Sequence, residues 1–194
     1  MGLFGLFGKK EDEAATIPAN DAEKWVTATY AMWSESAGGR WNFIAGSPEK
    51  NKSESASMRV MLRRDWEVNN KGSLLEQVSF LTSLYAEEDC EAEDIEMGAW
   101  DLCRACQILA MGYVGGYLER AEMISESCRV GRIMQRHYHS WAELYDSYVK
   151  GYADWRIVQG GEAEKDITER KELVKRLFNS PDGPCAVAWD TALA

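Results

Sequence analysis

The sequence predicts an all-α protein: a single-domain orthogonal bundle of about six to seven helices around one buried central helix, with few or no strands. Three observations support this fold class. Hydrophobic residues make up 45% of the 194 residues, which is enough to build a core. Apolar residues recur with helical spacing through most of the chain, whereas alternating runs of β-branched residues are few. Residues 105–118 carry no charge at all.

Several segments combine helical periodicity with capping residues. The first is expected to begin at Asn20 or Asp21 and to end at Ala37-Gly38-Gly39. The others are expected at about residues 55–65, from residue 73 to the acidic run at 87–96, at 97–118, at 119–138, from residue 140 onward and at 163–178. Residues 1–19 are expected to form a flexible leader, and residues 20–194 one helical domain.

Residues 97–118 are predicted to form the central helix. Its apolar residues occupy more than one face, and a helix that is apolar on most sides is a buried helix. Its uncharged part is shorter than the roughly 20 residues needed to cross a bilayer. The acidic run before it, EEDCEAEDIE, is typical of a solvated loop.

Composition argues against several classes of function. A net charge of −10 opposes nucleic-acid binding, because that binding depends on neutralising phosphates with Lys and Arg. Five cysteines, an odd number, indicate reduced thiols and a cytoplasmic location. Cys103-x-x-Cys106 lies within the apolar helix without a second ligand pair, so we interpret these thiols as structural. The acidic run also lacks the glycine of a calcium loop. We therefore expect no metal site and no cofactor.

The N-terminal segment MGLFGLFGKKEDE differs from a signal peptide, because its apolar stretch is short and precedes the lysines. One interpretation is a disordered leader. The other is a weak membrane-contacting or partner-binding tag, formed by Leu3, Phe4, Leu6 and Phe7. No stretch of the sequence reaches the length of a membrane span.

Five aromatic residues follow one another at spacings of four and three, which aligns them along one edge of a helix. They are Trp141, Tyr145, Tyr148, Tyr152 and Trp155. Ser140 caps the start of this helix, with Glu143 at the third position of a capping box. The aromatic edge is either core packing or the wall of a groove for a peptide or ligand.

A polar group lies at the entrance of the central helix. Asp101 and Arg104 are three residues apart and follow Trp100, so the two charges can pair on one face. One interpretation is a partly buried ion pair that fixes the register of the helix. The other is a pocket in which they are joined by Glu122, by Glu143 or by an arginine of the stripe formed by Arg129, Arg132 and Arg136.

The chain also contains an ordered series of short motifs: W-D-x-x-R, G-Y-x-x-G-Y, an acidic residue, S-W-x-E-L and G-x-x-x-W. They fall on Trp100, Asp101, Arg104, Gly112, Tyr113, Gly116, Tyr117, Glu122, Ser140, Trp141, Glu143, Leu144, Gly151 and Trp155. Over about residues 58–190 the series resembles the bacterial domain-of-unknown-function 1266 family. Cys185 departs from it, because the family often shows Ser-Pro-Trp near the end. The resemblance implies a bacterial cytoplasmic helical domain but no particular reaction.

Two functions of different classes are consistent with these residues. The first is a non-enzymatic interaction module that binds a protein or peptide partner through the aromatic edge or the arginine stripe. The second is a small hydrolase-type enzyme or toxin-like effector, with Asp101, Glu122 or Glu143 as acid or base and Arg104 as an anion clamp. The candidate functional residues are Trp100, Asp101, Arg104, Glu122, Ser140, Trp141, Glu143, Tyr148 and Trp155.

Overall fold

The computed structural model describes residues 15–87 and 90–193. These two ranges form eight α-helices, two short 3₁₀ turns and no strand, which confirms the all-α class. The count exceeds the prediction by one because the first predicted helix is broken at Tyr30, whose backbone (φ −114°, ψ 18°) leaves the helical region. The predicted N-terminal tag, residues 3–7, lies outside the described residues.

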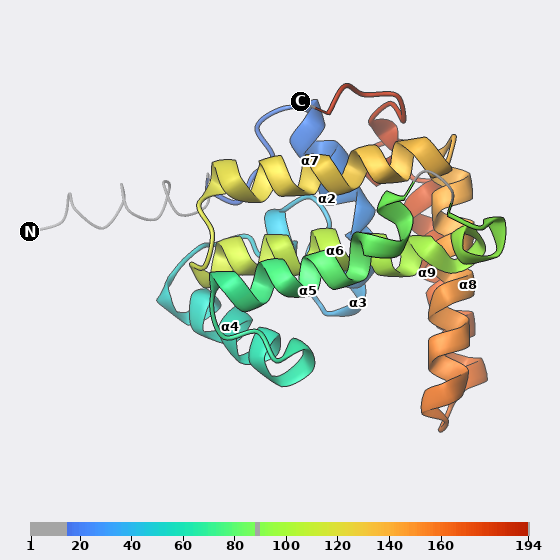
Figure 1. Ribbon diagram of the computed structural model, residues 1–194, viewed down its shortest axis with the longest axis horizontal. Helices are drawn as coiled ribbons and strands as arrows, with labels where there is room; N and C mark the ends of the chain where they lie inside the picture. The colour runs from blue at the N-terminus through green and yellow to red at the C-terminus, as the bar shows by residue number, and fades with distance from the viewer. Residues whose placement is uncertain (1–14, 88–89, 194) are drawn as a thin grey trace, which may run out of the picture.

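The helices follow one another with short connections (Figure 1). Their bounds are α2 Asp21–Thr29, α3 Ala31–Ser36, α4 Lys52–Trp66, α5 Lys71–Ala86, α6 Ala92–Gly115, α7 Arg120–His137, α8 Trp141–Gln159 and α9 Ala163–Phe178. The 3₁₀ turns are η1 Ile44–Gly46 and η2 Pro184–Ala186.

Helix α6 is the centre of the bundle, as predicted. It packs against α4, α5, α7 and α8, and every residue from 105 to 115 is buried. It ends at Gly116, which adopts the left-handed conformation (φ 83°) common after a helix. It begins at Ala92, so part of the acidic run is helical rather than loop. Carboxylates in a first helical turn are stabilised by the helix dipole, which explains the earlier start.

Helix α8 crosses α6 at a steep angle, and its far end projects from the body together with α9 (Figure 1). The contact is close because Gly151 carries no side chain. The Ser147 hydroxyl accepts a hydrogen bond from Ala99 N at 3.1 Å and donates to Ile95 O at 3.1 Å. These bonds fix the position of α8 along the first half of α6.

The described ends of the chain are fastened to this bundle by side chains of other helices. Tyr113 and Arg120 donate to Ala15 O, each at 2.8 Å. The C-terminal segment is held by Gln135, which donates to Trp189 O at 2.7 Å. Trp189 is therefore folded back onto the body. Within the described ranges no helix has the length and apolar character needed to cross a membrane.

Candidate functional site

Asp101 and Arg104 form an ion pair at the surface of α6. Arg104 Nη1 donates to Asp101 Oδ1 at 3.0 Å, and the side chains are 23% and 34% exposed. The Tyr85 hydroxyl of α5 donates to Asp101 Oδ2 at 3.2 Å. The pair is thus partly buried but not sealed from solvent.

Aromatic rings from three helices surround this pair. The Arg104 guanidinium carbon lies 4.7 Å from the Trp66 ring centroid and 4.8 Å from that of Trp100. Trp100 in turn contacts Tyr148, Tyr152 and Trp155, at centroid distances of 5.3, 5.5 and 5.6 Å. We call these residues the aromatic–arginine cluster: Trp66, Trp100, Arg104, Tyr148, Tyr152 and Trp155.

A second arginine closes the cluster from the side of α9. Arg170 lies 4.4 Å from the Tyr152 ring centroid and donates to the Tyr148 hydroxyl. Burial raises the pKa of Tyr148 to about 12, so its hydroxyl stays protonated at neutral pH. The Tyr148 hydroxyl is therefore neutral and is held in place by Arg170.

Burial also shapes the charges of the ion pair. It raises the pKa of Asp101 above its ordinary value of 3.8, and Arg104 and the Tyr85 hydroxyl only partly oppose this effect. Burial likewise lowers the pKa of Arg104, against the attraction of Asp101. Arg104 uses a single donor in its bond to Asp101, and an arginine has five. Its remaining donors can serve a bound molecule.

The raised pKa of Asp101 gives a prediction for stability against pH. Because the folded protein binds this proton before the unfolded chain does, wild type should gain stability relative to Asp101→Asn as the pH falls from neutral towards 3.8. Urea unfolding of both proteins at neutral pH and at about pH 4.5 measures this difference. If the difference in free energy of unfolding between the two proteins stays constant, or changes in favour of Asp101→Asn at low pH, the pKa of Asp101 is not raised by folding.

The aromatic edge of α8 is mostly core. Tyr145 and Tyr148 are each 2% exposed, and Trp141 and Tyr152 are also buried, whereas Trp155 is 41% exposed. Only the C-terminal end of the edge therefore reaches the surface, as part of the aromatic–arginine cluster.

Ser140, Trp141 and Glu143 lie at the other end of α8. Ser140 Oγ accepts a hydrogen bond from Glu143 N at 3.2 Å, and the Glu143 carboxylate accepts one from His139 N at 2.8 Å. Ser140 is therefore the N-cap, as predicted, but the predicted capping box is only half formed, because Glu143 bonds to the amide of the residue before the cap and not to that of Ser140. Trp141 donates from Nε1 to Val187 O at 2.8 Å and fastens the C-terminal segment.

Glu122 lies far from Asp101. It is in the first turn of α7, where it pairs with Lys71 and accepts from Glu119 N at 3.2 Å. The α6 end that precedes α7 is about 20 Å along the helix from Asp101. Glu143 is also distant, because Gly151 is the residue of α8 that lies against Trp100, and Glu143 is about 12 Å before Gly151 along α8. The structure therefore brings together Trp100, Asp101, Arg104, Tyr148 and Trp155 but not Glu122, Ser140, Trp141 or Glu143.

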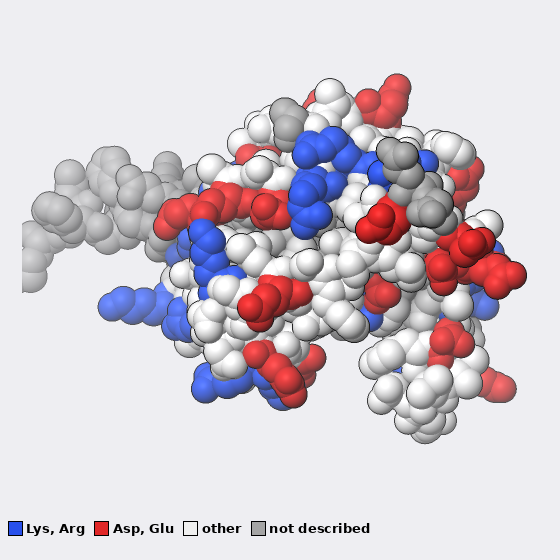
Figure 2. Space-filling view, in the orientation of Figure 1, with Lys and Arg blue, Asp and Glu red and all other residues white. Residues whose placement is uncertain are grey.

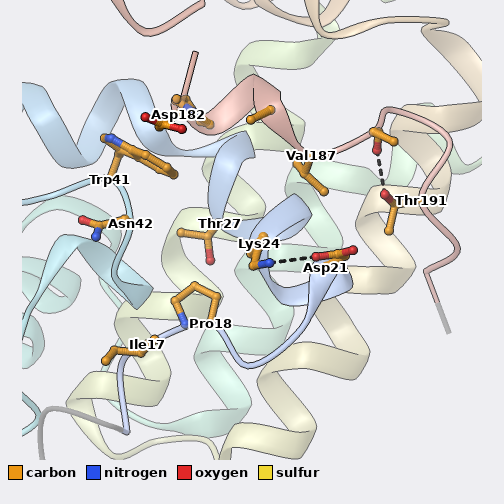
Figure 3. Close-up of a pocket in the computed structure, with 14 residues that line it drawn as sticks. Ile17, Pro18, Asp21, Lys24, Thr27, Trp41, Asn42, Asp182, Val187 and Thr191 are labelled. Atoms are coloured by element: carbon orange, nitrogen blue, oxygen red, sulfur yellow. Dashed lines mark hydrogen bonds and ion pairs between the residues drawn. The ribbon is translucent and has the colours of Figure 1, made fainter. Parts of the chain in front are cut away.

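A separate pocket of about 620 Å³ lies between α2, the segment before η1 and the C-terminal segment (Figure 3). The Lys24–Asp21 ion pair, 2.8 Å long, lines this pocket and lies below Val187 in the view of Figure 3. None of the nine candidate residues lines this pocket. The sequence feature that could have pointed to this pocket is the closing segment SPDGPCAVAW, because residues between 182 and 188 form one of its walls.

A family model described as "Protein of unknown function (DUF1266)" matches residues 20–192. The chain belongs to the DUF1266 family. The match confirms the resemblance and extends its N-terminal limit from about residue 58 to residue 20. The DUF1266 region thus takes in α2, α3 and most of the 620 Å³ pocket. No curated protein and no solved structure matches the chain.

Three of the five cysteines of this DUF1266 protein, Cys103, Cys106 and Cys128, are buried. Burial raises the pKa of Cys103 and that of Cys106, the latter to about 12. Such thiols stay protonated and unreactive at neutral pH. The described residues contain no group of three or more His, Cys, Asp or Glu side chains placed to hold a metal ion.

Proposed function

We propose that this protein is a non-enzymatic cytoplasmic interaction module that binds a segment of a partner protein at the aromatic–arginine cluster. One observation carries the proposal: the Arg104 guanidinium lies between two tryptophan rings, beside a third tryptophan, Trp155, that is 41% exposed. Trp, Tyr and Arg are the residue types that dominate the binding energy of protein interfaces.

The surface around the cluster favours a macromolecular partner. Figure 2 shows a hollow between the α4 side of the molecule and the projecting ends of α8 and α9, beside a largely uncharged surface. Trp66 is the last residue of α4, and Trp155 lies in the second half of α8. Large apolar side chains are also exposed nearby in sequence, Met97 at 43% and Ile157 at 65%. Exposed apolar side chains of this size are typical of interaction sites.

The chemistry of the cluster indicates what the partner segment carries. A large apolar side chain would pack against Trp155 and the edge of Trp100. A backbone carbonyl or carboxylate would accept hydrogen bonds from the donors of Arg104 that Asp101 leaves open. The five free cysteines support a cytoplasmic location.

The hydrolase-type alternative is less well supported by this geometry. A general acid and base must lie within hydrogen-bond reach of the reacting group. Asp101 pairs with Arg104, whereas Glu122 and Glu143 cap other helices. The three carboxylates therefore face three different parts of the molecule.

The test uses a photo-reactive phenylalanine analogue at position 155 in the full chain, expressed in a bacterial cell. It should crosslink to a discrete partner. The purified partner should then bind Trp155→Ala at least about tenfold more weakly than wild type, as expected for a central tryptophan of an interface.

Two matched variants sharpen this test. The same analogue at Phe80, an exposed ring (74%) on α5, should not crosslink to that partner. Arg104→Lys keeps the charge but loses the planar, stacked guanidinium, so it should also weaken binding. The proposal fails if position 155 gives no specific product, or if the partner binds Trp155→Ala as tightly as wild type.

A further inference from the structure

A different pocket, of about 540 Å³, lies between α3, the η1 turn and α4. Trp33, Met58 and Met61 supply a ring and two thioethers to its walls. Glu49 and Glu54 supply carboxylates, and no Lys, Arg or His lines it. Its volume is in the range of small-molecule sites.

Ser34 brings to this pocket a hydroxyl group without a hydrogen-bond partner. The residue is 1% exposed and lines the pocket. Among residues 15–87 and 90–193, Ser34 Oγ is the single buried side-chain nitrogen or oxygen that has no partner. An unpaired buried hydroxyl destabilises the folded state. A partner from outside the chain would remove this cost.

The turn beside Ser34 is held in a strained conformation. Ala45 has φ 55° and ψ 22°, in the left-handed region that residues other than glycine rarely adopt. Gly46, next to it, has φ 68° and lies against Ser34. Strain of this kind is common where a backbone shapes a ligand site.

The two carboxylates lack cationic partners. Neither Glu49 nor Glu54 takes part in any ion pair formed by the described part of the chain. Asn51 donates to Glu49 Oε2 at 2.8 Å, and Ser47 Oγ lies 3.1 Å from Glu54 Oε2, so one oxygen of each carboxylate stays open. The neighbouring Lys50 lies instead 3.7 Å from the centroid of a tyrosine ring of α6.

We propose that this pocket binds a primary alkylammonium compound, such as a diamine. Its ammonium groups would donate to Ser34 Oγ and to the open oxygens of Glu49 and Glu54, and its methylene groups would pack on Trp33 and the two methionines. A bare metal ion fits less well, because the pocket is wide and the described residues offer no group of three metal-ligating side chains.

Titration calorimetry of the full chain with 1,4-diaminobutane tests the proposal. The diamine should bind, whereas the neutral 1,4-butanediol and Mg²⁺ should not compete with it at equal concentration. Absence of diamine binding at millimolar concentration would overturn the proposal. So would a diol or a magnesium ion that binds equally well, because the site would then not select an organic cation.

Two variants locate the binding. Ser34→Ala should weaken diamine binding about tenfold, as for the loss of a hydrogen bond to a charged group. It should also raise the Tm of the ligand-free protein, because the unpaired hydroxyl is gone. Glu54→Gln should weaken binding similarly, whereas Glu76→Gln, an exposed carboxylate on α5, should not. Unchanged affinity in Ser34→Ala and Glu54→Gln, or a lower Tm in Ser34→Ala, would contradict the assignment.

Discussion

Replacing Trp25 with alanine should lower the free energy of unfolding by about 4 kcal/mol. The side chain is fully buried, and its ring lies 5.0 Å from the ring of Trp141 and 5.2 Å from that of Trp189. Its Nε1 donates to Trp189 O at 2.9 Å. The substitution removes these contacts and leaves a cavity that the surrounding helices only partly fill. Urea unfolding followed by circular dichroism measures the change.

The same substitution should loosen the C-terminal segment before the rest of the fold. Trp25 connects α2 to that segment, so amide hydrogen exchange should rise first over residues 184–193. Trp155→Ala is the control: its ring is 41% exposed, and it should cost about 1 kcal/mol. If the two variants were equally stable, the tryptophan contacts of α2 would not hold this end of the chain.

The central helix could be predicted from the sequence because its lack of charged residues indicates that it is buried. A helix that is uncharged and apolar on most sides is favoured in the interior, and residues 105–115 of α6 are all buried. The boundary at Ala92 could not be predicted in the same way. An acidic run is typical of loops, but the same carboxylates also favour the first turn of a helix, and only tertiary packing decides between the two.

The aromatic–arginine cluster was predicted in part. The spacing of the aromatic residues aligned Tyr148 and Trp155 on one helix edge, and the spacing of Asp101 and Arg104 predicted their pairing. The contact of Arg104 with Trp66 was beyond such reasoning, because it depends on where the end of α4 lies relative to α6. No local pattern encodes that position.

The order of the motifs in the sequence did not indicate which carboxylates lie near Asp101 in the structure. Glu122 and Glu143 lie between Asp101 and Trp155 in the sequence, yet each is at a helix start where its side chain caps backbone amides. Residues some twenty positions apart on helices are separated by a helix length of about 30 Å unless the chain turns back. The 620 Å³ pocket was missed for a related reason, since it combines residues from three separate segments of the chain. The 540 Å³ pocket is lined by α3, α4 and the connection between them, and its shape depends on how that connection folds.

Replacing Gly151 with alanine should destabilise the protein by about 3 kcal/mol. A Cβ atom at this position would lie 2.5 Å from Trp100 Cβ and 2.7 Å from the Met97 carbonyl oxygen. Both are close to the backbone of α6, so no flexible side chain can move aside, and the two helices must separate. The clash should outweigh the roughly 1 kcal/mol that alanine gains over glycine inside a helix.

Gly115→Ala is the matched control on α6. Its new Cβ would meet Arg59 Cγ at 3.5 Å and other side-chain atoms at longer distances, which is ordinary contact, so stability should stay level or rise slightly. Thermal unfolding of both variants separates the effect of alanine's helix propensity on stability from the effect of the clash between α8 and α6. Because Trp100 belongs to the aromatic–arginine cluster, a displaced α8 in Gly151→Ala should also expose its indole, seen as a red shift of tryptophan fluorescence. A variant as stable as Gly115→Ala would mean that α8 and α6 do not approach as closely as the Ser147 hydrogen bonds require.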